Sequence, residues 1–158
     1  MTHAYYRQEA KHLGMFLAEM LTTINAWAKD PAQFKRECEN YPGFLNYPKN
    51  DDPQKCEAIT FEQFNKAVGR WHQKLSGAFC NCLVSKEAVE VHNALTILSG
   101  LVPGAFPIHD TTHKDVKDKV NKMTDDRQHN FGNSITVMAK SINARLQMCE
   151  VTACVLLP

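Results

Sequence analysis

The chain has 158 residues, 44% of them hydrophobic and 22% charged, which is the composition of a single soluble globular domain. Its 18 basic and 17 acidic residues give a net charge of +1, and this balance excludes a chain-wide basic surface for nucleic acid. No apolar run approaches the roughly 20 residues needed to span a bilayer, and the opening residues MTHAYYRQEAKH lack a signal-peptide pattern. We therefore expect no membrane partner, and six cysteines that remain thiols in a reducing compartment.

Two helices are predicted at the start of the chain. The first runs from about Tyr5 to Lys29 and ends at Asp30, because a following proline disfavours the α conformation. Pro31 is then a good first residue for a short second helix, Pro31 to Glu39, with Phe34 facing inward. The apolar stripe of the first helix consists of Leu13, Leu17, Met20, Leu21, Ile24 and Ala28.

A turn and a loop follow these helices. In the sequence NYPGFL, Asn40 to Leu45, proline presets one backbone angle and Gly43 is expected to accept a positive φ. The polar, proline-containing stretch from Tyr47 to Ala58 is expected to be an exposed loop. Strand-type alternation is absent over any useful length, except in the tail Val151 to Leu156.

The strongest helix signal lies between Thr60 and Val84. Thr60 and Gln63 have the spacing of a capping box, in which each side chain bonds the other residue's backbone N–H. Apolar residues then recur every three or four positions, at Phe61, Phe64, Val68, Trp71, Leu75, Phe79 and Cys82. The core residues predicted for this part of the chain are Phe61, Phe64, Trp71, Leu75, Tyr41 and Phe44.

Three further helix starts are predicted downstream. Ser85 is a competent N-cap for a fourth helix, whose apolar side from Val91 to Leu101 should fold back and cover the central helix. Thr112 is expected to cap a fifth helix, and Asn133 or Ser134 a sixth. Amphipathic helices joined by short turns predict an all-α fold of antiparallel helix pairs, stacked as part of an α-solenoid.

Three motifs together resemble the C-terminal half of the THO complex subunit 2 family, the large scaffold of a nuclear mRNP assembly and export complex. They are EA-x-x-LG-x-FLAEML from Glu9, F-x-x-EC-x-NYPGFL from Phe34, and F-x-x-x-V-x-x-WH-x-KL from Phe64 to Leu75, with Trp27 between the first two. The resemblance runs from Glu9 to about Leu146 and assigns residues 1–148 to a scaffold segment. The tail 149–158 does not follow the family pattern.

The resemblance implies a non-catalytic α-solenoid scaffold of the THO/TREX machinery, located in the nucleus and acting in transcription-coupled mRNP assembly and mRNA export. The implied partners are other THO subunits and a DEAD-box RNA helicase, with RNA bound weakly or indirectly.

The sequence contains no pattern that predicts an enzyme, a cofactor or a metal. Cys80 and Cys82 point about 200° apart on a helix and cannot share an ion. His109 and His113 have a spacing that can bind zinc, and Cys149 and Cys154 could add ligands from the tail, but the usual zinc spacings are missing. We therefore expect buried thiols and surface histidines, with no nucleophile–base–orienter set.

One local feature supports an alternative function. Lys66, Arg70 and Lys74 recur every four residues and form a basic line on the outer side of the central helix, with His72 and Gln73 nearby. Such a line can contact RNA phosphates or an acidic partner, so the alternative is a helical RNA-binding domain. Charged helix faces are more often simply solvated, and that interpretation is favoured here.

Overall fold

The computed structural model describes residues 2–39, 41–46, 57–102, 104–107, 109–125 and 131–149. These residues form six α-helices, one 3-10 helix and two short strands. In chain order the elements are α1 (Thr2–Lys29), α2 (Pro31–Glu37), η1 (Pro42–Phe44), β1 (Leu45–Asn46), β2 (Glu57–Ala58), α3 (Phe61–Leu83), α4 (Ala88–Leu101), α5 (Asp110–Lys122) and α6 (Asn133–Gln147). The all-α prediction is confirmed, and two compact units, residues 23–70 and residues 1–22 with 71–158, divide the chain.

The two strongest helix-start predictions are confirmed. The side chain of Asp30 accepts a 2.8 Å hydrogen bond from the backbone N–H of Ala32, and Pro31 is the first residue of α2. At the start of α3, the Thr60 N–H donates to Gln63 Oε1 at 2.9 Å, and the Gln63 N–H donates to Thr60 Oγ1 at 3.2 Å. Both caps satisfy backbone donors that the first helical turn leaves without partners.

The other predicted caps are displaced. Helix α4 begins at Ala88 with Glu87 as its N-cap, and Ser85 only accepts a hydrogen bond from the Glu87 N–H. Helix α5 begins before Thr112, whose hydroxyl donates to the His109 carbonyl inside the first turn. Helix α6 begins after Gly132, which has φ 86° and ψ 166°, a backbone conformation that is almost confined to glycine.

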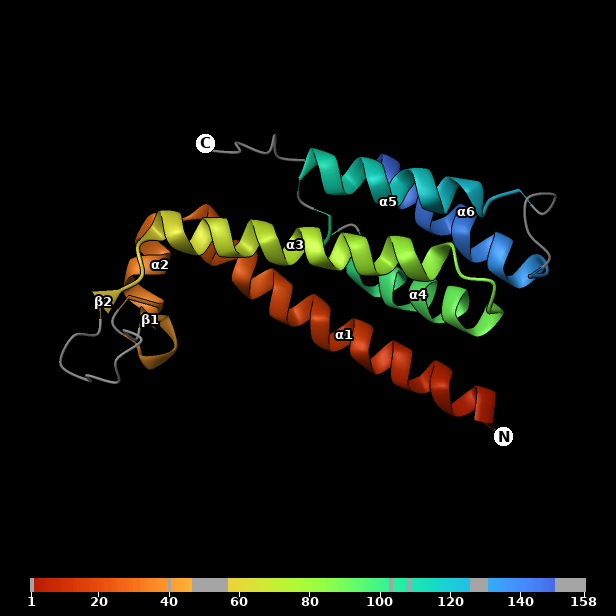
Figure 1. The fold of residues 1–158 in the computed structure, drawn as a ribbon, viewed down its shortest axis with the longest axis horizontal. Coiled ribbons are helices and arrows are strands. Elements are labelled where there is room, and N and C mark those ends of the chain that lie inside the picture. Colours follow the sequence, from red (N-terminus) through yellow and green to blue (C-terminus); the bar gives the residue numbers. More distant parts are fainter. Residues whose placement is uncertain are drawn as a thin grey trace. The chain divides into compact units, whose positions relative to one another are not determined.

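The unit of residues 23–70 contains the only strand pairing among the described residues. Strands β1 and β2 pair antiparallel, with Leu45 opposite Ala58 (Figure 1). This ladder of two residues per strand is an addition to the prediction, because strands so short leave no alternation to detect. The predicted loop from Tyr47 lies largely outside the described residues, and the prediction of a positive φ at Gly43 is wrong, since Gly132 is the glycine with that geometry.

The core of the same unit is an aromatic cluster, defined here as Trp27, Phe34, Phe44, Phe61 and Phe64. Phe34 is 3% exposed at its centre, with ring centroids 4.8 Å from Phe64, 5.6 Å from Phe61 and 6.0 Å from Phe44. Rings in contact at these separations add a favourable electrostatic interaction to their burial. The short helix α2 therefore serves to place one phenylalanine between η1 and the start of α3.

The unit of residues 1–22 and 71–158 has an aliphatic core. Helix α4 runs antiparallel to α3, α5 runs antiparallel to α6, and α6 packs against both α4 and α5 (Figure 1). Its buried side chains include Leu21, Leu83, Val91, Leu95, Leu98, Phe106, Val116, Ile142 and Leu146. The expectation that α4 covers the whole aromatic side of α3 is wrong, because Phe61 and Phe64 pack in the aromatic cluster while Phe79 and Leu83 join this core.

Helices α1 and α4 make backbone contact in this unit. A Cβ atom added at Gly14 would lie 3.2 Å from both Cα and the carbonyl oxygen of Ile97, and one at Gly100 would lie 3.4 Å from the carbonyl carbon of Gly14. A side chain at Gly14 would require the Ile97 backbone to shift by a few tenths of an ångström, so glycine at this position favours the close approach of the two helices. Polar bonds reinforce the packing, since Arg145 Nη1 donates to the Ser99 carbonyl at 2.8 Å and connects α6 to the end of α4.

Candidate docking surface

Helix α1 exposes an apolar face. Leu13, Phe16 and Met20 follow one another at steps of three and four and therefore lie on one side of the helix, which we call the α1 stripe. Their exposed fractions are 46%, 61% and 37%, and the neighbouring Met15 is 54% exposed. The adjacent side of the helix is covered, because Ala10 and Leu21, which lie about 100° around the helix from the stripe, are buried. An exposed row of large apolar side chains in an otherwise packed helix marks an interaction surface.

Charged side chains lie beside the α1 stripe. Glu9 lies on the same side of the helix one turn before Leu13, Glu19 lies about a quarter turn from the stripe, and both are exposed. An apolar centre with a polar rim is the usual arrangement of a protein–protein interface. The described helices include none long and apolar enough to cross a membrane.

The predicted core residues differ in their burial. Phe64 is 2% exposed, whereas Phe61, Leu75 and Phe44 are half-buried. The prediction that Trp71 belongs to the core is wrong, because its side chain is 45% exposed. Tyr41 is also exposed, at 57%, so of the NYPGFL turn it is Phe44 that joins the aromatic cluster.

His72 is buried where Trp71 was expected. Its ring is stacked on Phe106 with centroids 5.7 Å apart and meets His109 edge-on at 5.8 Å. Burial, and secondarily the nearby His109, lower the pKa of His72 to about 4, so the ring is neutral in the folded protein near pH 7. The step of four from Phe64 through Val68 to His72 was the available signal for this position.

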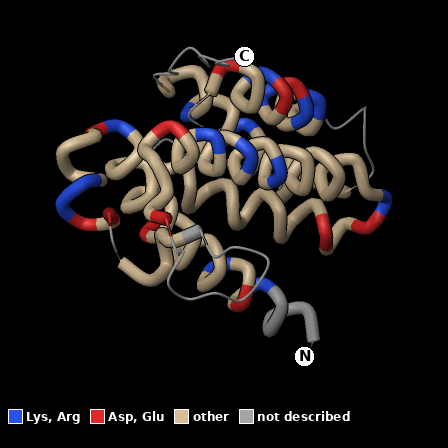
Figure 2. The backbone as a smooth tube through the Cα atoms, turned by 60° about the vertical axis from the view of Figure 1, so that its left-hand side comes forward, with Lys and Arg blue, Asp and Glu red and all other residues tan. Residues whose placement is uncertain are grey.

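The predicted basic line is exposed. Lys66, Arg70 and Lys74 all lie on α3 with exposed side chains, and none of them forms an ion pair with another residue that the structure describes. Figure 2 shows blue positions along this helix, while α5 above it carries blue and red positions in alternation. Whether the line contacts RNA remains a prediction.

The histidines and cysteines considered as metal ligands have other roles. His113 Nε2 lies 2.7 Å from the Leu146 carbonyl oxygen and must donate to it, because a carbonyl only accepts. His109 meets His72 instead, and the described residues contain no group of three or more potential ligands. Burial raises the pKa of the Cys80 and Cys149 thiols, which is opposite to the shift that activates a nucleophile, and Cys154 lies outside the described residues.

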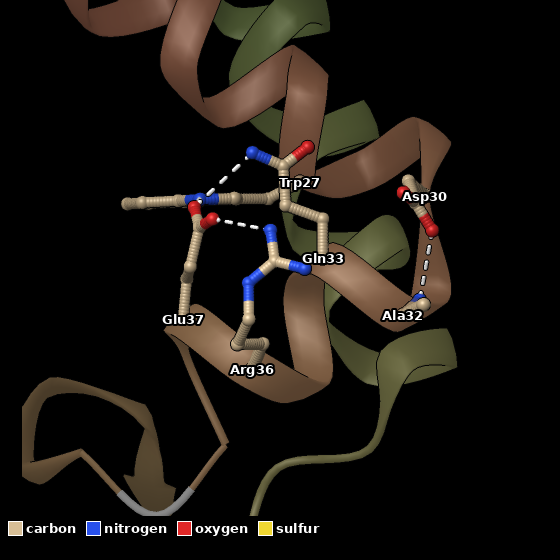
Figure 3. Close-up of polar contacts among 6 residues, drawn as sticks. All are labelled: Trp27, Asp30, Ala32, Gln33, Arg36 and Glu37. Carbon is tan, nitrogen blue, oxygen red and sulfur yellow. Dashed lines mark hydrogen bonds and ion pairs between the residues drawn. The ribbon is translucent and has the colours of Figure 1, made fainter.

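A polar network joins α1 to α2 beside the aromatic cluster (Figure 3). Glu37 Oε2 accepts hydrogen bonds from Trp27 Nε1 at 2.7 Å and Gln33 Nε2 at 3.1 Å, and Arg36 Nη2 donates to Oε1 at 2.8 Å. The bonds from Arg36, Trp27 and Gln33, in that order, lower the pKa of Glu37 to about 2. A carboxylate held ionised in this way orients the Trp27 ring rather than transferring a proton.

Comparison with known proteins places most of the chain in one family. Residues 3–146 match the family described as transcription factor/nuclear export subunit protein 2. The chain is 37% identical over 98 residues to THO complex subunit 2 of Homo sapiens and equally to that of Mus musculus, which covers 60% of this chain and 6% of each relative. It is 29% identical over 137 residues to THO complex subunit 2 of Arabidopsis thaliana, covering 87% of this chain and 7% of that protein. No solved structure matches.

Proposed function

Because the chain belongs to the transcription factor/nuclear export subunit protein 2 family, we propose that it is a non-catalytic scaffold segment of a THO/TREX complex. In this role it acts in the nucleus, in transcription-coupled mRNP assembly and mRNA export. The observation that carries the proposal is the α1 stripe, an apolar surface suited to binding another protein. Other THO subunits and a DEAD-box RNA helicase are its proposed partners.

The proposed larger architecture is an α-solenoid. The antiparallel pairs α3–α4 and α5–α6 are the kind of unit that solenoids repeat, and such units need neighbours to cover their outer faces. The chain spans only 6% to 7% of the length of the relatives that it matches, so those relatives contain many further segments. We propose that a helix of another THO protein covers the α1 stripe with its own apolar face.

The residues present favour holding proteins over transforming a substrate. The half-buried thiols of Cys80 and Cys149 have raised pKa values, His72 is neutral inside the core, and the Glu37 carboxylate accepts from three donors. These groups lie in different places instead of converging on one nucleophile–base–orienter set among the described residues. RNA contact through Lys66, Arg70 and Lys74 would be weak and would fall steeply with salt.

The proposal is tested by recovery of identified THO subunits. The tagged chain is incubated in nuclear extract treated with nuclease, and THO subunits are quantified in the eluate. Phe16→Asp should abolish recovery, because a charge would be buried in the apolar interface, while circular dichroism stays helical. Val137→Asp is the matched control, since Val137 is 58% exposed on α6, away from the stripe.

Two outcomes would contradict this function. Recovery that disappears with nuclease, combined with tight RNA binding by the pure chain near physiological salt, would replace the scaffold with the RNA-binding alternative. Equal loss of recovery in Phe16→Asp and Val137→Asp would show that the α1 stripe has no specific role.

A further inference from the structure

A groove of about 580 Å³ runs between α3 and α5 within the unit of residues 1–22 and 71–158. Its α3 side includes Ser76, Gly77 and Cys80, three residues whose small side chains extend little beyond the helix backbone. Small side chains let the backbone of another helix approach closely, as at the contact between Gly14 and Gly100. The groove therefore has one wall, on α3, that a docked helix can approach closely.

The α5 wall of the groove is charged in a defined order. Asp115 and Asp118 line it nearer the start of the helix, and Lys119 and Lys122 line it nearer the end. The outer two charges are seven positions apart, which corresponds to about 10 Å along a helix. The groove thus presents a negative half followed by a positive half.

These charges are available to a partner. Asp115 with Lys119, and Asp118 with Lys122, have the spacing at which a helix forms internal ion pairs. Neither pair forms, and none of the four makes an ion pair with any residue in the described part of the chain. Asp115, Asp118 and Lys122 are exposed, and Lys119 is half-buried.

We propose that this groove binds a helical segment of a protein partner that carries basic side chains over Asp115 and Asp118 and acidic side chains over Lys119 and Lys122. The occupant is a protein helix rather than nucleic acid, because two carboxylates in the same wall repel a polyanion. Matching opposite charges also fixes the direction in which the helix lies. The inference goes beyond the scaffold role, since the groove and the α1 stripe involve different residues.

Three fluorescein-labelled, alanine-based helical peptides test the proposal against the full chain by fluorescence anisotropy. The mixed peptide carries two arginines three positions apart and, one turn later, two glutamates at the same spacing, whereas the others carry four arginines or four glutamates at the same positions. We expect the mixed peptide to bind about tenfold more tightly than either uniform peptide, because each uniform peptide places two like charges over half of the wall. Binding should weaken as salt is added.

Charge reversal locates the site. Asp115→Lys with Asp118→Lys should transfer the preference to the four-glutamate peptide, and Lys119→Glu with Lys122→Glu should transfer it to the four-arginine peptide. Lys114→Glu with Lys140→Glu changes the net charge as much as Lys119→Glu with Lys122→Glu does, but outside the groove lining, and should leave the mixed peptide preferred. Circular dichroism confirms that each variant keeps its helices.

Several results would overturn the proposal. The mixed peptide could bind no better than the uniform ones, or the control variant could lose as much affinity as the groove variants. Binding of a single-stranded RNA oligonucleotide that is lost in Lys119→Glu with Lys122→Glu would assign the groove to nucleic acid. By contrast, loss of THO recovery in Phe16→Asp with unchanged peptide binding would support the proposal that the groove and the α1 stripe are separate sites.

Discussion

The two units of the chain build their cores from different kinds of side chain. Residues 23–70 use five aromatic rings, with Phe34 at the centre, supplied by short elements and by the ends of two long helices. Residues 1–22 with 71–158 use aliphatic side chains on paired helices, closed by a backbone contact at Gly14. Large rings can fill the space between irregular segments, whereas small aliphatic residues need regular helices that approach closely.

The two units also differ in where they place the polar groups that contact their cores. The aromatic cluster keeps its polar partner at the surface, where Glu37 accepts from the Trp27 ring nitrogen. The aliphatic unit places His72 and part of His109 inside, where burial keeps both pKa values below the usual range for histidine. The first unit should therefore be sensitive to ring truncation and the second to acid.

The largest expected effect comes from truncating the centre of the aromatic cluster. Phe34→Ala should lower the free energy of unfolding by about 3–5 kcal/mol, because a fully buried ring is replaced by a cavity. Chemical denaturation measures the loss, and hydrogen exchange locates it. Protection should fall in residues 23–70.

Leu95→Ala is the matched variant for the other core, where Leu95 is fully buried on α4. It should cost about 2–5 kcal/mol and lower protection in α4 and α6. If both variants reduce protection equally throughout the chain, the two units unfold as one and the comparison fails.

The second-largest effect should be the loss of stability of the aliphatic unit in acid. A histidine in the unfolded chain takes up a proton near pH 6.5, whereas His72 in the folded chain does so at about 4. Between these values the unfolded state binds more protons, so stability falls as pH falls from 6.5 towards 4. Between pH 7 and pH 5 the loss should be about 2 kcal/mol, measured by urea titration at each pH.

His72→Leu should flatten this pH dependence, whatever its effect on absolute stability. His12→Gln, on the exposed side of α1, should leave the slope as it is. A slope unchanged in His72→Leu would assign the acid sensitivity to other groups.

A pair of glycine substitutions tests the close approach of α1 and α4. Gly14→Ala should destabilise the chain by about 1–3 kcal/mol, because its methyl group would press on the backbone of Ile97. Gly77→Ala places a methyl group in open space within α3 and should stabilise by up to about 1 kcal/mol through helix propensity. If both substitutions shift the melting temperature in the same direction, the result would contradict a close backbone contact at Gly14.

Trp71→Ala should have the smallest effect of these destabilising changes. Because the ring is 45% exposed, its removal should cost about 1 kcal/mol, well below the loss for a buried aromatic residue. A loss comparable to that of Phe34→Ala in the same denaturation experiment would show that Trp71 is a core residue after all.

The sequence was sufficient where a structure depends on neighbouring residues. The capping box at Thr60 and the Asp30–Pro31 boundary involve contacts within three positions, and both are observed. The caps predicted at Ser85 and Thr112 failed because their helices begin at Ala88 and Asp110. Hydroxyl side chains bond the backbone inside helices and turns as well as at caps, so residue type alone does not fix a start.

The choice between Trp71 and His72 depended on distant residues. Adjacent positions on a helix point about 100° apart, so a small rotation of the core-facing side exchanges one for the other. Phe106 and His109, more than thirty positions away, form the surface that accepts the imidazole of His72. The α3–α5 groove could not be predicted from the sequence either, because its walls come from segments far apart in the chain.

The short β1–β2 ladder has a consequence for how this segment can be altered. Leu45 pairs with Ala58 and Asn46 with Glu57 across it, so the residues on either side of the stretch 47–56 are held next to each other. The entropy of closing a loop grows only with the logarithm of its length, and doubling the length costs about 0.6 kcal/mol. A peptide epitope inserted between Pro48 and Pro53 should therefore leave the fold intact. Such an internal tag would allow an antibody to detect this segment within its assembly.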